Sequence, residues 1–293
     1  MNKTPSRYFV FVGLLFSSMS SFFIRLIDGP SLTVAAYRLV AASAFFMVPF
    51  VLQIKSNKNS ATIMTKADVA MSIASGFFLA GHFATWISSL AYTSVASSTV
   101  LVSLSPVFVA TFNRVFLKEK LKQAHLVGMV VALAGAIIIA DGGFRLSRSA
   151  LLGDSLALLG AVFVSGYIII GRYVRKQLDL VSYVFITYAS AAVFLILVAS
   201  LSAGGMAYGT FSNLGLMILH GLVSSGVGHT LYNWMLQYTS STFVSVATLG
   251  EPLIASIMVF LFFSETPTVQ TVVGGVIVIL GLLVFSREGK IVK

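Results

Sequence analysis

Side chains that could do chemistry are scarce in this sequence of 293 residues. It contains nine acidic residues, four histidines and no cysteine, which excludes disulfides, thiolate nucleophiles and cysteine-ligated metal sites. It also lacks the zinc-protease run His-Glu-x-x-His, the hydrolase elbow Gly-x-Ser-x-Gly and a phosphate-binding loop. We therefore expect no enzyme, no metal site, no cofactor and no ATP-driven pump, and treat the remaining polar residues as candidates for a binding site.

Glu251 is the acidic residue placed deepest inside an apolar segment. It stands three positions after Thr248 and directly before Pro252, whose missing N–H leaves backbone carbonyls without a helical donor. A carboxylate beside free carbonyls could bind the amine of a substrate or relay a proton, and we count Thr248 with this site. The alternative is a packing role, in which Glu251 hydrogen-bonds a neighbouring helix.

Two polar-aromatic faces are predicted from residues four positions apart, which share one side of a helix. His229 and Asn233 form one face with Tyr232 beside it, and His82 and Trp86 form the other. Pockets for small amphipathic molecules combine aromatic walls with a few polar anchors, and a ring or a cation can stack on them. We expect both faces to line a cavity, although a histidine in an apolar helix can also be a packing residue.

Arg38 is the basic residue that falls within an apolar segment. Its rigid, forked guanidinium could hold a substrate carboxylate. The alternative is a bond to helix-end carbonyls or to an acid such as Glu251. Ser105, which precedes Pro106 as Glu251 precedes Pro252, is added to the candidate substrate or coupling residues.

The elements that carry these residues are predicted to cross a membrane. The chain is 57% hydrophobic and 10% charged with a mean hydropathy of +0.96, whereas soluble domains are about 45–50% apolar and about 25% charged. A membrane helix needs about 20 apolar residues. Continuous apolar runs exclude a β-barrel and predict ten helices, at 8–27, 31–54, 67–90, 94–116, 121–141, 151–171, 180–202, 213–236, 241–263 and 268–286.

The basic residues predict the orientation of the chain. With both termini in the cytoplasm, 15 of the 19 lysines and arginines lie on the cytoplasmic side, as the positive-inside rule requires. The formal net charge of +10 is therefore accounted for without a nucleic acid partner. We expect an integral protein of the cytoplasmic (inner) membrane whose surroundings are the lipid bilayer.

An internal repeat appears when the sequence is shifted by half its length. Tyr92-Thr93-Ser94 then falls on Tyr238-Thr239-Ser240, and the same offset pairs Pro106 with Pro252, Glu119 with Glu265, Gly128 with Gly274, Gly135 with Gly281 and Trp86 with Tyr232. Each half, 1–146 and 147–293, contains five predicted helices, so the two cross the membrane in opposite senses. Inverted repeats are typical of secondary transporters, whose substrate site lies between the halves; the alternative is a duplicated scaffold without transport.

The repeated positions also predict structural roles. Small residues let membrane helices approach closely, so the paired glycines predict contact between the fifth and tenth helices. Glu119 and Glu265 lie at predicted helix ends, where caps or ion pairs are more typical than substrate contacts.

The runs Leu249-Gly250-Glu251-Pro252-Leu253-Ile254-Ala255 and Leu104-Ser105-Pro106-Val107-Phe108, with Gly153-Asp154-Ser155-Leu156, resemble the signature of EamA-like transporters of the drug/metabolite transporter superfamily. The resemblance covers essentially the whole chain. It implies ten helices in two inverted five-helix repeats around a central cavity, and usually the export of metabolites, amino acids or drugs.

We therefore expect an all-α membrane protein that works as a secondary transporter. Its expected substrates are small organic metabolites, either amino acids, including aromatic ones, or drug-like amphipathic solutes. Transport is expected to be export by alternating access, in a monomer, with protons as a candidate coupling ion. The alternative is a passive facilitator or channel for small metabolites.

Overall fold

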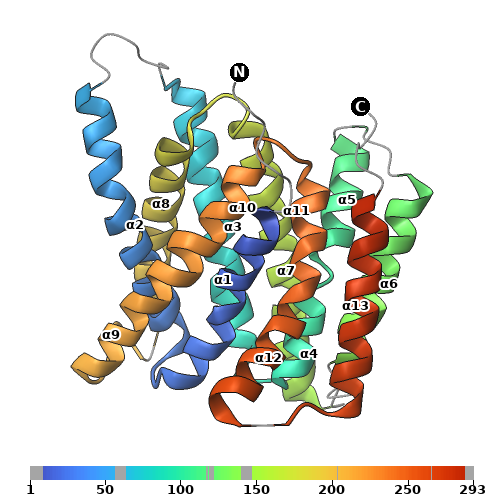
Figure 1. Ribbon diagram of the computed structural model, residues 1–293. Coiled ribbons are helices and arrows are strands. Elements are labelled where there is room, and N and C mark those ends of the chain that lie inside the picture. The colour runs from blue at the N-terminus through green and yellow to red at the C-terminus, as the bar shows by residue number, and fades with distance from the viewer. Residues whose placement is uncertain are drawn as a thin grey trace.

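The computed structural model describes residues 9–56, 64–116, 118, 122–139, 147–202, 204–264 and 266–287, and every regular element within these ranges is a helix. Most of the helices run along one common direction, and the start of α1 and the end of α13 lie toward the same end of the bundle (Figure 1). The α-helices are α1 (Phe9–Leu26), α2 (Ser31–Ser56), α3 (Lys66–Ser89), α4 (Val95–Val102), α5 (Ser105–Phe116), α6 (Gln123–Ile139), α7 (Arg148–Val174), α8 (Leu180–Leu201), α9 (Phe211–His220), α10 (Thr230–Met235), α11 (Ser241–Ala247), α12 (Glu251–Phe263) and α13 (Val269–Arg287).

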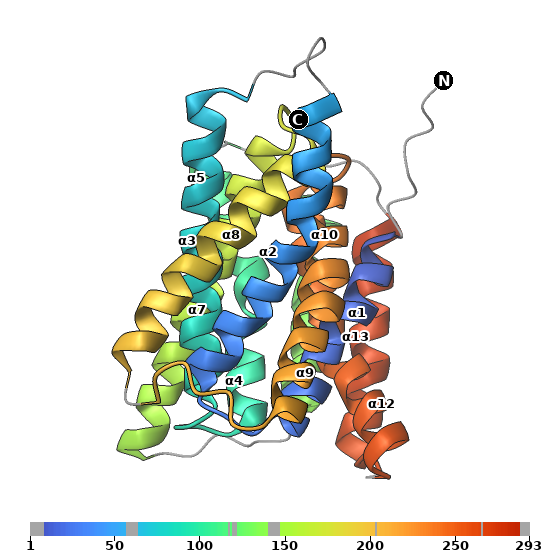
Figure 2. The same cartoon turned by 90° about the vertical axis from the view of Figure 1, so that its left-hand side faces the viewer.

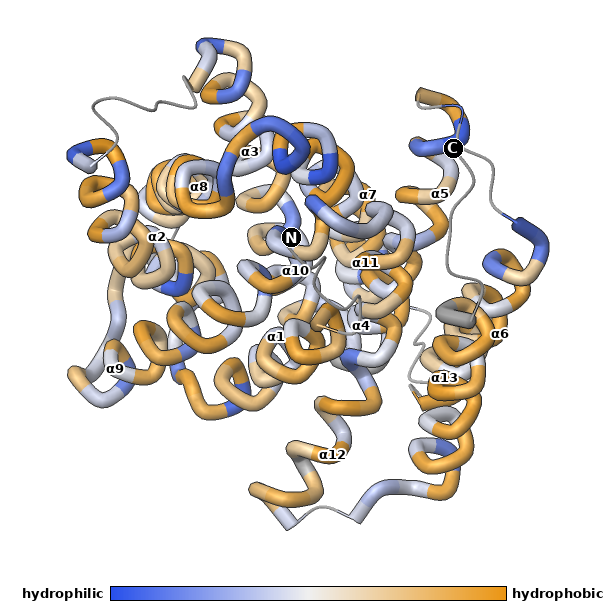
Figure 3. Tube along the Cα trace, turned by 45° about the horizontal axis from the view of Figure 1, so that its top comes forward, coloured by the Kyte–Doolittle hydropathy of each residue, from blue (hydrophilic) through white to orange (hydrophobic). Residues whose placement is uncertain are grey.

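The ten predicted membrane spans are confirmed. Eight helical segments of at least 18 residues are long and apolar enough to cross a bilayer, and Gln123–Ile139 and Val269–Phe285 are shorter apolar helices at the positions of the fifth and tenth spans. Hydrophobic colouring runs along the helices while hydrophilic segments gather at their ends (Figure 3). Large apolar side chains such as Phe45, Val130 and Val272 are exposed on the outside, as a lipid-facing surface requires.

The fourth and ninth spans are broken at equivalent places. The fourth consists of α4 and α5, and the ninth of α11, a 3-10 turn (Thr248–Gly250) and α12. Pro106 and Pro252 stand at the second position of α5 and α12, where a missing N–H costs no helical bond but prevents continuation from the preceding helix. Both spans also start with a serine cap: the hydroxyls of Ser94 and Ser240 each accept a backbone N–H at 3.0 Å.

The eighth span changes its winding in the middle. Between α9 and α10 it runs as a π-helix, Gly221–His229, which no sequence pattern had predicted. Two glycines let this segment pack backbone against backbone, since a Cβ at Gly221 would overlap the carbonyl oxygen of Arg38 and one at Gly228 would lie 2.6 Å from the amide nitrogen of Ser17. The π-helix is thereby held between α1 and α2 (Figure 2).

The fifth and tenth spans, α6 and α13, pack closely and run in opposite directions. A Cβ at Gly128 would lie 2.8 Å from that of Phe285, and one at Gly135 would lie 2.6 Å from the amide nitrogen of Val278. A Cβ at Gly281 would overlap the backbone of Ala132. α6 and α13 occupy equivalent positions in the two halves of the sequence. Because they lie antiparallel, the two halves run through the bundle in opposite senses. Glu119 and Glu265 lie outside the described residues.

Candidate functional site

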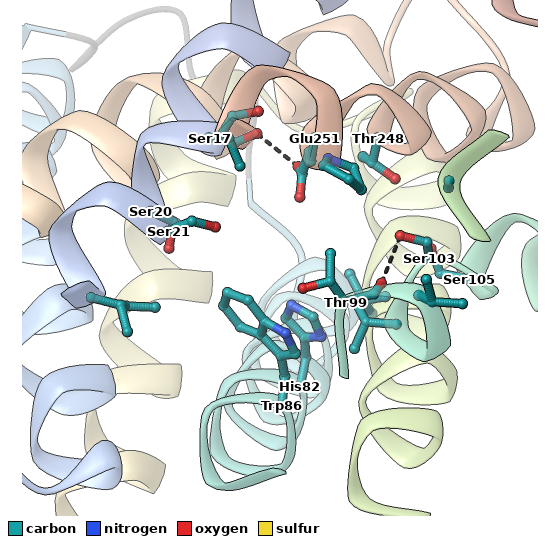
Figure 4. Close-up of a pocket in the computed structure, with 18 of the residues that line it drawn as sticks. Ser17, Ser20, Ser21, His82, Trp86, Thr99, Ser103, Ser105, Thr248 and Glu251 are labelled. Carbon is teal, nitrogen blue, oxygen red and sulfur yellow. Dashed lines mark hydrogen bonds between the residues drawn. The ribbon is translucent and has the colours of Figure 1, made fainter. Parts of the chain in front are cut away.

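A cavity of about 650 Å³ lies between the helices and takes its walls from both halves of the chain. All nine residues assigned from the sequence to substrate binding or coupling line it: Arg38, His82, Trp86, Ser105, His229, Tyr232, Asn233, Thr248 and Glu251. The structure thus brings together residues that are more than 200 positions apart. His82 and Trp86 point into the space that Glu251 and the α4–α5 break face from other sides (Figure 4).

The cavity is open at one end and closed at the other. At the end where α1 stops and α13 begins, it is bordered by the exposed residues Arg25, Thr266 and Pro267. Toward the termini it ends on Leu236 and Val244, which are both buried. Among the described lining residues, those that are exposed lie at one end of the cavity.

Polar contacts hold the closed end together. Two arginines at the end of α7 reach across to the end of α10: Arg172 donates to the carbonyl oxygen of Leu236 at 2.5 Å, and Arg175 donates to that of Asn233 at 3.2 Å and to Oε1 of Gln237 at 2.7 Å. In the first half of the repeat, Leu26 and Gly29 occupy the positions equivalent to Arg172 and Arg175, and they lie at the open end. Neither residue can donate from its side chain, so the bonds of Arg172 and Arg175 have no repeat equivalent at the open end.

Glu251 begins α12 and faces α1 and α10. Its Oε1 accepts a hydrogen bond from the Ser17 hydroxyl at 2.8 Å and lies 3.3 Å from the Tyr232 hydroxyl. Ser17 Oγ and the Tyr232 hydroxyl oxygen are themselves 2.8 Å apart. Both hydrogen bonds of this carboxylate within the described residues involve Oε1, so Oε2 can accept from a solute. The carboxylate therefore makes the interhelical bonds expected of a packing residue and also lines the cavity.

Arg38, on α2, is buried with 1% of its surface exposed. Its Nε donates to Ser225 Oγ at 2.6 Å, its Nη1 donates to Ser20 Oγ at 2.9 Å, and its Cζ lies 4.1 Å from the centre of the Phe83 ring. Among the described residues, no carboxylate lies within 4 Å of the guanidinium, so the predicted alternative of a direct pair with Glu251 does not occur. Buried charges in proteins are normally paired, which makes Arg38 a candidate for binding an anionic group.

His82 and Trp86 form one wall of the cavity as a stacked pair, with ring centres 5.9 Å apart and an angle of 2° between the planes. His82 Nδ1 lies 3.0 Å from the carbonyl oxygen of Gly160. Because a carbonyl can only accept, Nδ1 carries the proton, and in the neutral ring Nε2 is left as an acceptor. Trp86 Nε1 is buried and has no hydrogen-bond partner in the described structure, so it can donate to a solute.

His229, Tyr232 and Asn233 form the wall opposite α3. The His229 ring lies 5.4 Å from the Phe83 ring and 5.9 Å from the Tyr232 ring, measured between centres. Asn233 is buried and its Oδ1 accepts from the Tyr167 hydroxyl at 2.8 Å. The amide of Asn233 is thus committed to the protein, and His229 offers the more available polar group.

Thr248 and Ser105 mark the two helix breaks. The Thr248 hydroxyl donates back to the Ser245 carbonyl at 2.7 Å, and the Ser105 carbonyl accepts from the Ser165 hydroxyl at 3.1 Å. At each break, a side-chain hydroxyl of the protein therefore hydrogen-bonds one of the backbone carbonyl groups.

The serines of α1 are the part of the site that sequence reasoning missed. Ser17, Ser18, Ser20 and Ser21 all line the cavity, and two of them bind the charged groups. Four serines within five residues of one apolar span were a visible signal. Tyr167 and Phe83 were missed as well, because single aromatic residues in a membrane helix do not stand out.

Comparisons with known proteins agree with this architecture. The EamA-like transporter family matches the chain twice, at residues 6–140 and 151–287. An uncharacterized transporter of Bacillus subtilis, YxxF, is 24% identical over 94% of this chain and 88% of its own length. The pseudopaline exporter CntI of Pseudomonas aeruginosa is 24% identical over 80% of each chain. A crystal structure with 16% sequence identity superposes with a TM-score of 0.79 over 95% of both chains and shows the same fold. The chain belongs to the EamA-like transporter family.

Proposed function

We propose that this protein is a secondary carrier that exports small organic metabolites across the cytoplasmic membrane by alternating access. The observation that carries the proposal is the one-sided cavity, which combines an aromatic wall with two charged groups in the middle of the membrane helices. Such a site suits amino acids, aromatic ones included, and amphipathic drug-like solutes. The kinship with a pseudopaline exporter supports the direction of export.

The orientation in this proposal follows from the charge distribution, with both termini in the cytoplasm. The end of the cavity that is bordered by Arg25, Thr266 and Pro267 then faces outward, and the end sealed by Arg172 and Arg175 faces inward. The structure corresponds in this orientation to the state that releases exported solute. Both halves of the site come from one chain, so we propose that the monomer is sufficient.

A passive facilitator or channel is the alternative function. A channel needs a continuous path, whereas this cavity ends on buried Leu236 and Val244, which favours the carrier. Flux through a channel would not saturate or show counter-flow, and a carrier does both.

Glu251 is the proposed coupling residue, because it is the carboxyl group that lines the cavity and Ser17 and Tyr232 connect it to two other helices. We expect saturable solute exchange in proteoliposomes, with uptake stimulated by a pH gradient. Replacing Glu251 with Gln keeps the shape but removes the titratable group, so it should abolish the response to the gradient. The matched control is Asp68→Asn, at the exposed N-terminus of α3. Saturable exchange that ignores both the gradient and the substitution would assign Glu251 to packing and keep the carrier.

A further inference from the structure

The cavity extends sideways, between α12 and the pair formed by α6 and α13. Ala255 and Ser256 of α12, Ile139 of α6 and Thr271 of α13 all line it. Because residues on both sides line the same space, the space between α12 and the α6–α13 pair belongs to the cavity. Figure 3 shows the end of α12 standing away from α6 and α13. This space is the lateral slot, and these four residues define it.

Close contacts set the limits of the lateral slot toward α13. A Cβ at Gly275 would lie 2.6 Å from Cδ1 of Leu253, so α12 and α13 touch one turn deeper than Thr271. A Cβ at Gly274 would lie 2.8 Å from Cγ1 of Ile139, so α6 and α13 are closed against each other. The slot is therefore confined to the part of the membrane near the open end of the cavity, and it lies beside α12.

α12 is covered on the side of α1 but not on the side of the slot. The Phe22 ring of α1 lies 5.0 Å from the Phe262 ring and 5.7 Å from the Phe263 ring, measured between centres. Among the described side chains of α12, only Pro252 is buried, and the residues 253–256, which cover a full turn, are all partly exposed. A full turn without a buried residue shows that protein does not seal the side that faces the slot.

The repeat-equivalent helix α5 is packed where α12 is open. Val109, the equivalent of Ala255, is 0% exposed. Asn113 ties α5 to α11, because its Nδ2 donates to Ser241 Oγ at 2.8 Å and to Thr242 Oγ1 at 3.1 Å. A half-helix after a proline break can thus be fully packed in this fold. The lateral slot is a property of α12 and does not follow from the break alone.

The walls of the slot suit hydrocarbon rather than water. Two of its four residues are apolar, and the hydroxyls of the other two are already bonded. Ser256 Oγ donates to the carbonyl oxygen of Pro252 at 2.8 Å, and the hydroxyl oxygens of Thr271 and Thr268 lie 3.1 Å apart. Polar groups that are satisfied within their own helix need no water at membrane depth. The surface left for an occupant consists of methyl and methylene groups.

We propose that the lateral slot is a lipid site, through which the acyl chain of a membrane phospholipid reaches from the bilayer into the cavity. Trp86, Ile139 and Thr271 each stand within one turn of the end of their helix at the open end, so the chain meets the Trp86 wall at this depth. While no solute is bound, the chain keeps the apolar wall out of contact with water. This inference goes beyond the proposed function; only the assignment of the lipid to the outer leaflet rests on the orientation proposed there.

The test uses the fluorescence of Trp86 in the full-length protein with Trp234→Phe, which removes the second tryptophan. The protein is placed in nanodiscs of dibrominated phosphatidylcholine or of the same lipid without bromine. Bromine quenches tryptophan only at close approach, so we expect strong quenching in the brominated lipid. Iodide in the buffer is the second quencher, because it enters the cavity from the open end through water.

Variants that fill the slot distinguish its occupant from lipid outside the bundle. Ser256→Phe should reduce quenching by brominated lipid several-fold and leave quenching by iodide undiminished. Thr271→Phe fills the slot from the opposite wall and replaces the first variant if that one does not fold, as judged by melting temperature. The matched control is Ile257→Phe, because Ile257 is the exposed neighbour of Ser256 and does not line the cavity. This variant should be quenched like the parent protein.

Three outcomes would overturn the lipid site. The first is absence of quenching by brominated lipid in the parent protein. The second is quenching that both slot variants retain, which would place the lipid outside the slot. The third is an equal loss of bromine and iodide quenching, which would mean that the substitutions block the whole cavity. None of these results affects saturable solute exchange, so the carrier stands or falls separately.

Discussion

A partly buried side chain keeps its charge when neighbouring groups offset the cost of burial. Asp179, outside the membrane spans, shows how. Burial opposes its ionisation, but hydrogen bonds from Ser182 and Gln53 and the charge of Arg175 outweigh this effect, so the pKa of Asp179 lies below its ordinary value. Its carboxylate also caps α8, accepting the Ser182 amide at 3.0 Å.

A carboxyl group with a lowered pKa stabilises the fold above its ordinary pKa, about 3.9, and loses that contribution as the pH falls through its pKa in the folded protein. We expect Asp179→Asn to keep the helix cap, since Asn and Asp cap equally well. The variant should lose the pH-dependent contribution of the carboxylate to stability. The melting temperature of the wild type should therefore exceed that of the variant at pH 6, and the gap should close below about pH 4. Parallel melting curves from pH 6 to pH 3 would contradict this assignment.

At the scale of elements, the α6–α13 contact depends on the absence of side chains. A Cβ at Gly135 would lie 2.6 Å from a backbone nitrogen of α13, and a Cβ at Gly281 would overlap the backbone of α6. The double substitution Gly135→Leu and Gly281→Leu should force the helices apart and reduce the yield of folded, monodisperse protein several-fold. Gly215→Leu is the matched control, because nothing lies within 4 Å of a Cβ at that position. Wild-type yield and melting behaviour of the double variant would refute the contact.

The seal between α7 and α10 is a second element-scale feature. Arg175→Met keeps the length of the side chain but removes its hydrogen bonds to Asn233 and Gln237, each worth about 1.5–3 kcal/mol when the donor is charged. The loss of even one such bond is worth more than a factor of ten, so the floor of the cavity should open at least tenfold more often. Because the chain has no cysteine, Val244→Cys gives a single reporter whose labelling by an impermeant maleimide from the terminus-bearing face measures this opening. Lys176→Met, an exposed charge beside Arg175, should leave the rate unchanged; equal rates in both variants would rule out the seal.

For the whole molecule, the sequence was sufficient to predict the ten spans, because apolar run length alone decides which segments cross a bilayer. The break beside Glu251 followed from Pro252, whose effect on the backbone is local, and its repeat equivalent Pro106 stands at the second break. The π-helix could not be predicted, since it depends on how Gly221 and Gly228 meet α1 and α2 in space. The α1 serines were missed for a related reason: each hydroxyl is unremarkable until Ser17 and Ser20 are seen beside the charges that they bind.

The seal at the closed end also bears on how the carrier would cycle. Arg172 and Arg175 bind the end of α10 on one side of the membrane, and Leu26 and Gly29 occupy the equivalent places on the other. In the proposed carrier, these bonds would favour the access state whose site faces the side opposite the termini. Resetting the empty carrier would break these bonds, and we expect this step to limit net export. We therefore expect one-for-one exchange of solute, in which binding energy offsets the loss of these bonds, to run faster than net flux.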